Sequence, residues 1–82
     1  MSWNYRIVKF PGYCALHEVF YDAQGSPWGR SEKPVIFMSA TPEELTRDLR
    51  FAMRDVVRRK VLDDPKGVWP GKNPLEGGKK DG

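Results

Sequence analysis

The sequence predicts an α+β fold: a three-stranded antiparallel meander with one amphipathic C-terminal helix packed on one face. Three observations support this prediction. Residues 2–38 contain three segments rich in aromatic and β-branched residues, and short turn motifs with glycine separate them. Residues 41–60 then place apolar side chains at helical spacing. Short connections favour antiparallel neighbours, and the helix is expected to close over one face of the sheet.

Alternation of side chains predicts the first two strands. In residues 2–10, SWNYRIVKF, every second residue shares a face. One face carries Trp3, Tyr5 and Ile7, and the other carries Arg6, Val8 and Phe10. Pro11-Gly12 marks a turn, and residues 14–21, CALHEVFY, form the second strand.

The third strand is predicted between Trp28 and Met38, after a hairpin turn at residues 22–25 that ends in glycine. Gly29 and Pro34 interrupt it. Because proline has no amide hydrogen for the sheet, this strand is either broken in two or lies at an edge.

Residues 41–60 have the start signals and the periodicity of a helix. Thr41 is a suitable N-cap, Pro42 suits the first helical position, and Glu44 completes a capping box. One side of this helix is apolar, with Leu45, Leu49, Ala52, Met53 and Val56. The opposite side is basic, with Arg47, Arg50, Arg54 and Arg58. Glu43–Arg47 and Asp55–Arg59 have the i,i+4 spacing of ion pairs.

Residues 1–63 are expected to form one β-β-β-α domain. Residues 61–63 are either a short extra strand or the end of the helix. Residues 64–82, rich in proline, glycine and lysine, are predicted to be a flexible tail. The single cysteine cannot form an internal disulfide, and neither a signal peptide nor a membrane span is evident. We therefore expect a cytoplasmic protein that does not bind membranes.

The composition argues against an enzyme and against a cofactor. Cys14 and His17 are the only cysteine and histidine, and on a strand their spacing of three places them on opposite faces. They cannot form a nucleophile–base pair within one chain, and they are too few for a metal site. The sequence also has no glycine-rich phosphate loop. We expect no catalytic, cofactor-binding or metal-binding residue, and a structural role for His17.

Both faces of the predicted sheet carry apolar side chains, and one helix covers only one of them. The remaining face should therefore bury itself against a partner, most simply a second copy of the chain. The predicted contact residues of this homodimer are Trp3, Tyr5, Val19, Tyr21 and Trp28. The sequence does not decide which face of the sheet the helix covers.

Nucleic acid is the alternative partner. The chain has a net charge of +3, and the excess of basic residues is concentrated on the helix. Arginines along one helix face can follow a phosphate backbone, and an aromatic side chain between them can stack on a base. The candidate residues are Arg47, Arg50, Phe51, Arg54 and Arg58. The competing explanation is an ordinary solvated helix face.

Two resemblances follow from these motifs. The runs W-N-Y-R at residues 3–6, H-E-V-F-Y-D at residues 17–22 and T-P-E-E-L at residues 41–45 resemble a group of small uncharacterised bacterial proteins. The order of three strands and a helix is also similar to the domain of HicB-type antitoxins, although the G-C-x-S/T strand of that family is missing. This second resemblance implies an antitoxin-like partner of a small protein as a further alternative.

Overall fold

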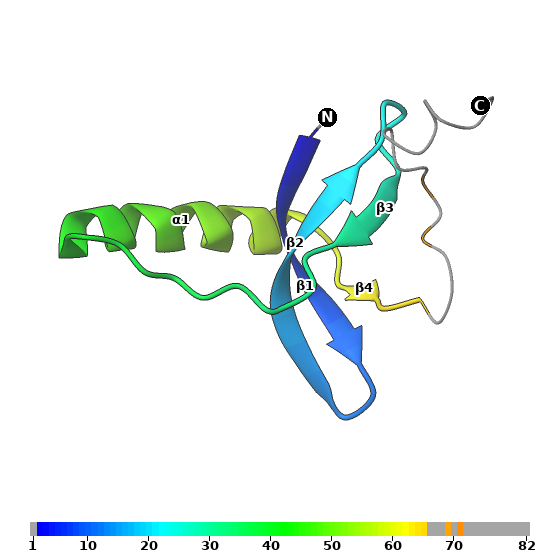
Figure 1. Cartoon of the computed structure of the whole chain (residues 1–82), viewed down its shortest axis with the longest axis horizontal. Helices are drawn as coiled ribbons and strands as arrows, with labels where there is room; N and C mark the ends of the chain where they lie inside the picture. Colours follow the sequence, from blue (N-terminus) through cyan, green and yellow to red (C-terminus); the bar gives the residue numbers. More distant parts are fainter. Residues whose placement is uncertain (1, 66–68, 70, 72–82) are drawn as a thin grey trace.

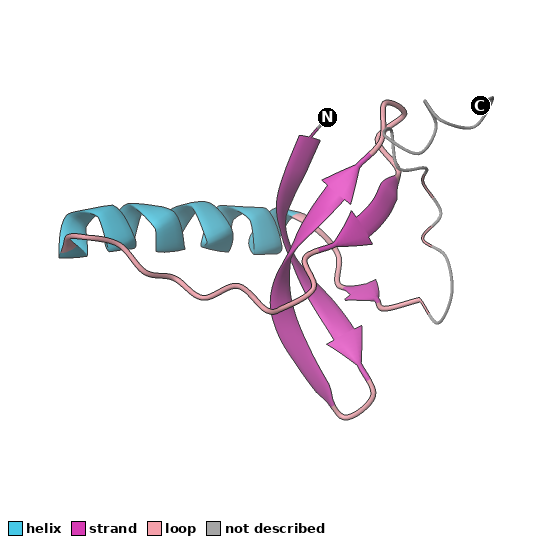
Figure 2. Ribbon diagram, viewed as in Figure 1, coloured by secondary structure: helices cyan, strands magenta, loops and turns pink. Residues whose placement is uncertain are grey.

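The computed structural model describes residues 2–65, 69 and 71, and these form a four-stranded sheet with one helix (Figures 1 and 2). The elements are β1 (Ser2–Phe10), β2 (Tyr13–Tyr21), β3 (Pro27–Arg30), α1 (Pro42–Arg58) and β4 (Leu62–Asp63). The sheet order is β3-β2-β1-β4, and β4 runs parallel to β1. The α+β class is confirmed, whereas the three-stranded meander is extended by a fourth, parallel strand at its edge.

A regular hairpin of β1 and β2 is the centre of the sheet. Trp3 lies opposite Phe20, and Phe10 lies opposite Tyr13. The two turns of the meander use glycines with positive φ, 85° at Gly12 and 83° at Gly25, which side chains with a Cβ rarely adopt. Only the first part of the predicted third strand forms, because β3 ends at Arg30. It lies at the edge, as the proline and glycine predicted.

The sheet curls so that its two outer strands approach each other. Arg30 of β3 donates from Nε to a carboxylate oxygen of Asp64, just after β4, at 2.7 Å. Inside the curl lies a small core of Val8, Val19 and Tyr21, with Phe10 and Leu62 packed against it. Leu62 belongs to β4. Within residues 61–63, for which the sequence allowed either a short strand or the end of the helix, a strand therefore forms and helps to close this core.

The helix begins as predicted but does not cover the sheet. The side chain of Thr41 accepts a hydrogen bond from the Glu44 amide at 3.1 Å, which confirms the N-cap. Within the described residues, β1 is the one strand that α1 approaches, and most of the helix extends beyond the sheet (Figure 1). Of the expected packing on one sheet face, the structure shows contact of α1 with β1, and the rest of the helix lies beyond the sheet. No helix in the described residues has the length and apolar character to cross a membrane.

An extended segment, residues 31–41, leads from β3 along α1 (Figure 2). Its Val35 amide donates to the Leu16 carbonyl at 2.8 Å, and the Ser39 hydroxyl donates to Asp48 of α1 at 2.9 Å. The segment is thus attached to the sheet at one end and to the helix at the other. We call residues 31–41 together with α1 the arm.

The predicted tail falls mostly on residues outside the described part of the chain. Of the residues that are described there, Trp69 is half-buried, and the Gly71 amide donates to the Pro27 carbonyl at 2.8 Å. A Cβ on Gly71 would lie 2.5 Å from the Ser26 carbonyl oxygen. This position therefore contacts the turn before β3 closely enough to require glycine.

The first prediction compares two valines. Val8 is fully buried, whereas Val57 on α1 is 74% exposed. Val8→Ala should lower the free energy of unfolding by about 1.5–3 kcal/mol because it empties part of the core. Val57→Ala should change it by less than about 0.5 kcal/mol. Urea unfolding followed by tryptophan fluorescence at submicromolar concentration measures both, and equal losses would contradict the core described above.

Candidate interaction surface

The direction of the arm is fixed where α1 ends. Arg6 of β1 is buried, 8% exposed, and donates from Nε and Nη2 to the Lys60 carbonyl at 3.1 and 2.6 Å. Its Nη1 donates to the Tyr21 hydroxyl at 2.9 Å. One turn before the helix end, Asp55 accepts the Tyr5 amide at 3.0 Å. These contacts, which we call the clamp, attach the end of α1 to β1.

Aromatic side chains gather on the face of the sheet opposite the core. Trp3 and Tyr5 meet edge to face with ring centroids 5.2 Å apart, and Phe20 stacks on Trp28 at 5.6 Å. Phe37 from the arm contacts Tyr5 at 5.6 Å. Trp3 is 50% exposed, whereas Tyr5, Phe20 and Trp28 are half-buried. We call Trp3, Tyr5, Phe20 and Trp28 the aromatic face.

The arm also exposes apolar side chains. Leu49, Met53 and Val57 follow one another at a spacing of four residues and are 48%, 62% and 74% exposed. We call them the apolar row. On the extended segment, Ile36 and Met38 are 79% and 82% exposed. In contrast, Ala52 is the buried helix residue among the described ones. Replacement of a buried leucine by alanine lowers the free energy of unfolding by about 2–5 kcal/mol. Because Leu49 is exposed in a single chain, Leu49→Ala should not cause a loss of this size.

The five contact residues predicted from the sequence lie on two opposite faces. Trp3, Tyr5 and Trp28 belong to the aromatic face. Val19 and Tyr21 are 0% and 8% exposed and belong to the core. The cause is the hairpin register, which pairs Trp3 with Phe20 and thereby turns the neighbours of Phe20 inward. We therefore remove Val19 and Tyr21 from the candidate surface.

Residues of the arm are the part that sequence reasoning missed. Leu49 and Met53 were assigned to a face buried on the sheet, and Ile36 and Met38 to a strand. The amphipathic pattern gave the apolar side of the helix correctly, but such a pattern does not say what covers that side. The one available signal was Pro34, which disfavours a continuous third strand.

The basic stripe of the helix is exposed. Arg47, Arg50, Arg54 and Arg58 are all accessible, as is Phe51 at 53%. The Arg54 guanidinium lies 5.8 Å from the centre of the Phe51 ring. The expected pairs Glu43–Arg47 and Asp55–Arg59 do not form, since the salt bridge of the described residues joins Arg30 to Asp64. The arginines therefore remain available to a partner.

Cys14 and His17 are separated by their environments. Cys14 is exposed near the first turn, whereas His17 is 2% exposed in the core. The His17 Nδ1 lies 2.9 Å from the Ser31 carbonyl oxygen. Because a carbonyl can only accept, Nδ1 carries the proton and donates it. Within the described residues, no group of three His, Cys, Asp or Glu side chains is placed to hold a metal ion.

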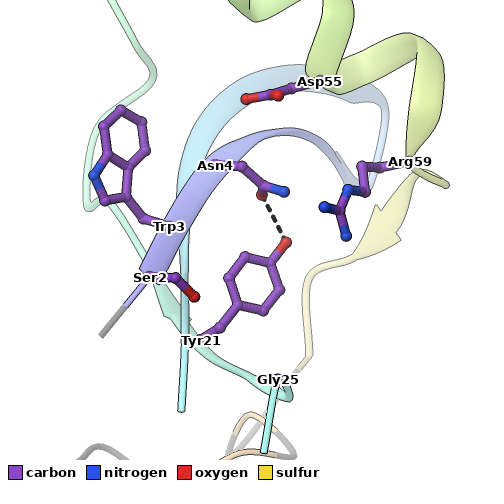
Figure 3. A pocket seen from close by; sticks show the side chains of 7 residues that line it. All are labelled: Ser2, Trp3, Asn4, Tyr21, Gly25, Asp55 and Arg59. Carbon is purple, nitrogen blue, oxygen red and sulfur yellow. Dashed lines mark hydrogen bonds between the residues drawn. The ribbon is translucent and has the colours of Figure 1, made fainter. Parts of the chain in front are cut away.

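A shallow hollow of about 390 Å³ lies where the clamp meets the sheet (Figure 3). Asn4, Tyr21, Asp55 and Arg59 are among its lining residues. The Tyr21 hydroxyl, which accepts from Arg6, donates to Asn4 at 2.6 Å. The polar groups here mainly hold one another, and Asp55 and Arg59 bring opposite charges. The hollow thus lacks the enclosed apolar wall of a small-molecule site.

The second prediction concerns the pKa of the Tyr5 hydroxyl. Burial raises the pKa of its hydroxyl, and the negative charges of Glu18, Asp48 and Asp55 raise it further. Because the folded pKa is above the unfolded value, Tyr5 favours folding below pH 10, and this contribution is lost as the pH rises through the folded pKa. Absorbance titration near 295 nm should show that Tyr5 ionises, in a late step, above the pH at which a solvated tyrosine does.

Tyr5→Phe identifies that component, because it should remove the late step and leave the rest of the titration unchanged. Glu18→Gln should shift the step to lower pH, since it removes one of the charges that raise the pKa. A late step that persists in Tyr5→Phe would contradict the assignment.

Comparison with known proteins gives no family for the chain: no family model matches it, and no similar curated protein or solved structure was found.

Proposed function

We propose that this protein is a small, non-catalytic interaction module that associates with itself through the open face of its sheet. The observation that carries the proposal is the aromatic face, on which the large side chain of Trp3 is 50% exposed. Large aromatic side chains dominate the binding energy of protein interfaces and prefer their centres. The single cysteine is compatible with a cytoplasmic location, which we include in the proposal.

The size of the folded part supports association. A domain of about 60 residues buries only about 60% of the surface of its unfolded chain and is marginally stable alone. Here the fully buried side chains are Val8, Val19 and His17, so the core of the described residues is small even for this length. Burial of further apolar surface against a second copy would stabilise the fold, because association adds to the stability of the folded state.

The third prediction tests self-association with a matched pair of variants. Trp3 on the aromatic face and Tyr13 on the opposite face are both exposed, at 50% and 60%. Light scattering over a concentration series should show a dimer for the natural chain at high micromolar concentration. Trp3→Glu should raise the dissociation constant at least about tenfold, whereas Tyr13→Glu should leave it unchanged. A natural chain that stays monomeric throughout would refute the proposed function.

Nucleic-acid binding through the helix is a second candidate function. The observation in its favour is the exposed basic stripe without acidic partners among the described residues, together with Phe51 beneath Arg54. Exposed arginines that neutralise phosphates release counterions, so affinity falls steeply with salt. The aromatic ring could stack on an unpaired base.

The fourth prediction separates the two contributions. If the stripe binds single-stranded RNA or DNA, Arg47→Ser with Arg50→Ser should reduce the slope of log affinity against log salt by about 1.4. Phe51→Ala should weaken binding by about 1–3 kcal/mol without changing that slope. Fluorescence anisotropy with labelled oligonucleotides measures both quantities. The absence of binding at low salt would exclude this candidate.

A further inference from the structure

The chain exposes apolar side chains on two different parts of the molecule, and on one of them a single side chain is exposed. One is the aromatic face of the sheet, where Trp3 is 50% exposed and Tyr5, Phe20 and Trp28 are half-buried, and the other is the apolar row on the arm, 48–74% exposed. We infer that two copies exchange arms: the apolar row of each chain covers the aromatic face of the other. This inference rests on the proposed self-association and names its geometry.

The clamp keeps the apolar row of an arm away from its own sheet, although Phe37 of the same arm contacts Tyr5 on the aromatic face. Arg6 holds the Lys60 carbonyl with two hydrogen bonds, and Asp55 holds the Tyr5 amide. The start of the arm is held by the bond from Val35 to Leu16, and Ser39 ties the extended segment to the helix. To turn back onto its own sheet, α1 would have to break these contacts. A second copy can be covered with all of them intact.

The two surfaces match in size. The apolar row covers eight residue steps of helix, about 12 Å at 1.5 Å per residue. The aromatic face crosses β1, β2 and β3, about 10 Å at the spacing of neighbouring strands. Ile36 and Met38 of the same arm, 79% and 82% exposed, add apolar surface toward the roughly 800 Å² per partner of a stable interface.

The polar residues beside these surfaces are complementary. Arg50 follows Leu49 on the helix, is exposed, and has no ion pair within the described residues. Glu18 lies opposite Tyr5 on the sheet and shares its face. An arm placed on the aromatic face thus brings an arginine toward a carboxylate at the rim. Such rim charges contribute mainly to orientation and association rate.

The aromatic face also shows a sign of being incomplete. The Trp28 indole nitrogen is buried and finds no acceptor among the described residues. Buried indole N–H groups usually have a partner, because an unpaired one loses its hydrogen bond to water without replacement. The aromatic face therefore keeps one unsatisfied buried polar group among the described residues.

Exchange by a two-fold axis closes the assembly. Each chain gives one arm and receives one, so both surfaces of both chains are used and growth stops at two copies. Arm against arm and face against face are the competing geometries. Each of them would use only one of the two surfaces, and this difference makes the geometries distinguishable.

The experiment uses one variant for each surface. Met53→Glu places a charge in the apolar row, and Trp3→Glu places one on the aromatic face. Phe51→Glu is the matched control for the arm, because Phe51 is 53% exposed and lies on the opposite side of the helix from Met53, which is 62% exposed. Circular dichroism checks that each variant remains folded. Light scattering then gives the average mass of each variant and of an equal mixture of Met53→Glu and Trp3→Glu.

Arm exchange predicts that both surface variants lose dimer by at least about tenfold in dissociation constant and that Phe51→Glu does not. It also predicts that the mixture has a higher average mass than either variant alone at the same total concentration. A dimer with exchanged arms has two arm–face contacts. In the mixed pair, both substitutions fall in the same contact, so the other contact joins an unchanged arm to an unchanged face.

Other outcomes overturn the inference in defined ways. If only Met53→Glu weakens the dimer, arms meet arms, and both the exchange and the open-face proposal fail. If only Trp3→Glu weakens it, the open-face proposal stands without exchange. If both variants dissociate and mixing restores nothing, the arm and the face do not contact each other. A natural chain that is monomeric removes the proposed function itself.

Discussion

The buried guanidinium of Arg6 is the interaction on which the arrangement depends. It has no carboxylate partner among the described residues, and its hydrogen bonds go to the Lys60 carbonyl and the Tyr21 hydroxyl. A buried cation with neutral acceptors is normally unfavourable. Here the acceptor lies two residues after Arg58, the last residue of α1, near the end where the partial negative charge of the helix favours a cation. Because Arg6 is also part of β1, the end of the helix and the centre of the sheet are held together.

This attachment determines which surfaces remain open. α1 is held at its end rather than along its length, so its apolar row faces solvent in a single chain. The curl of the sheet, closed by Arg30 and Asp64, takes Val19 and Tyr21 inside and leaves the aromatics outside. The same strands thus produce a small core on one face and an aromatic face with an exposed Trp3 on the other.

Local features were predictable from the sequence, and long-range placements were not. The N-cap at Thr41, the turn glycines and the edge position of β3 follow from backbone chemistry that acts within a few residues. The position of α1 depends on Arg6 and Lys60, 54 residues apart, and a strand pattern gives no reason to pair them. For the candidate surface, the alternation of side chains along the strands was enough to propose Trp3, Tyr5 and Trp28. The register between β1 and β2 was needed to show that Val19 and Tyr21 lie on the other face.

The energetic comparison favours a second copy over a rearranged single chain. Turning the arm back would break two hydrogen bonds of Arg6, and bonds to charged groups contribute about 1.5–3 kcal/mol each. It would also leave a buried charge without acceptors, which is among the most destabilising changes in a protein. The proposed arm exchange would instead keep the clamp and cover both apolar surfaces, against the loss of translational and rotational freedom. The clamp that leaves the monomer open is therefore the physical reason to expect that a partner closes it.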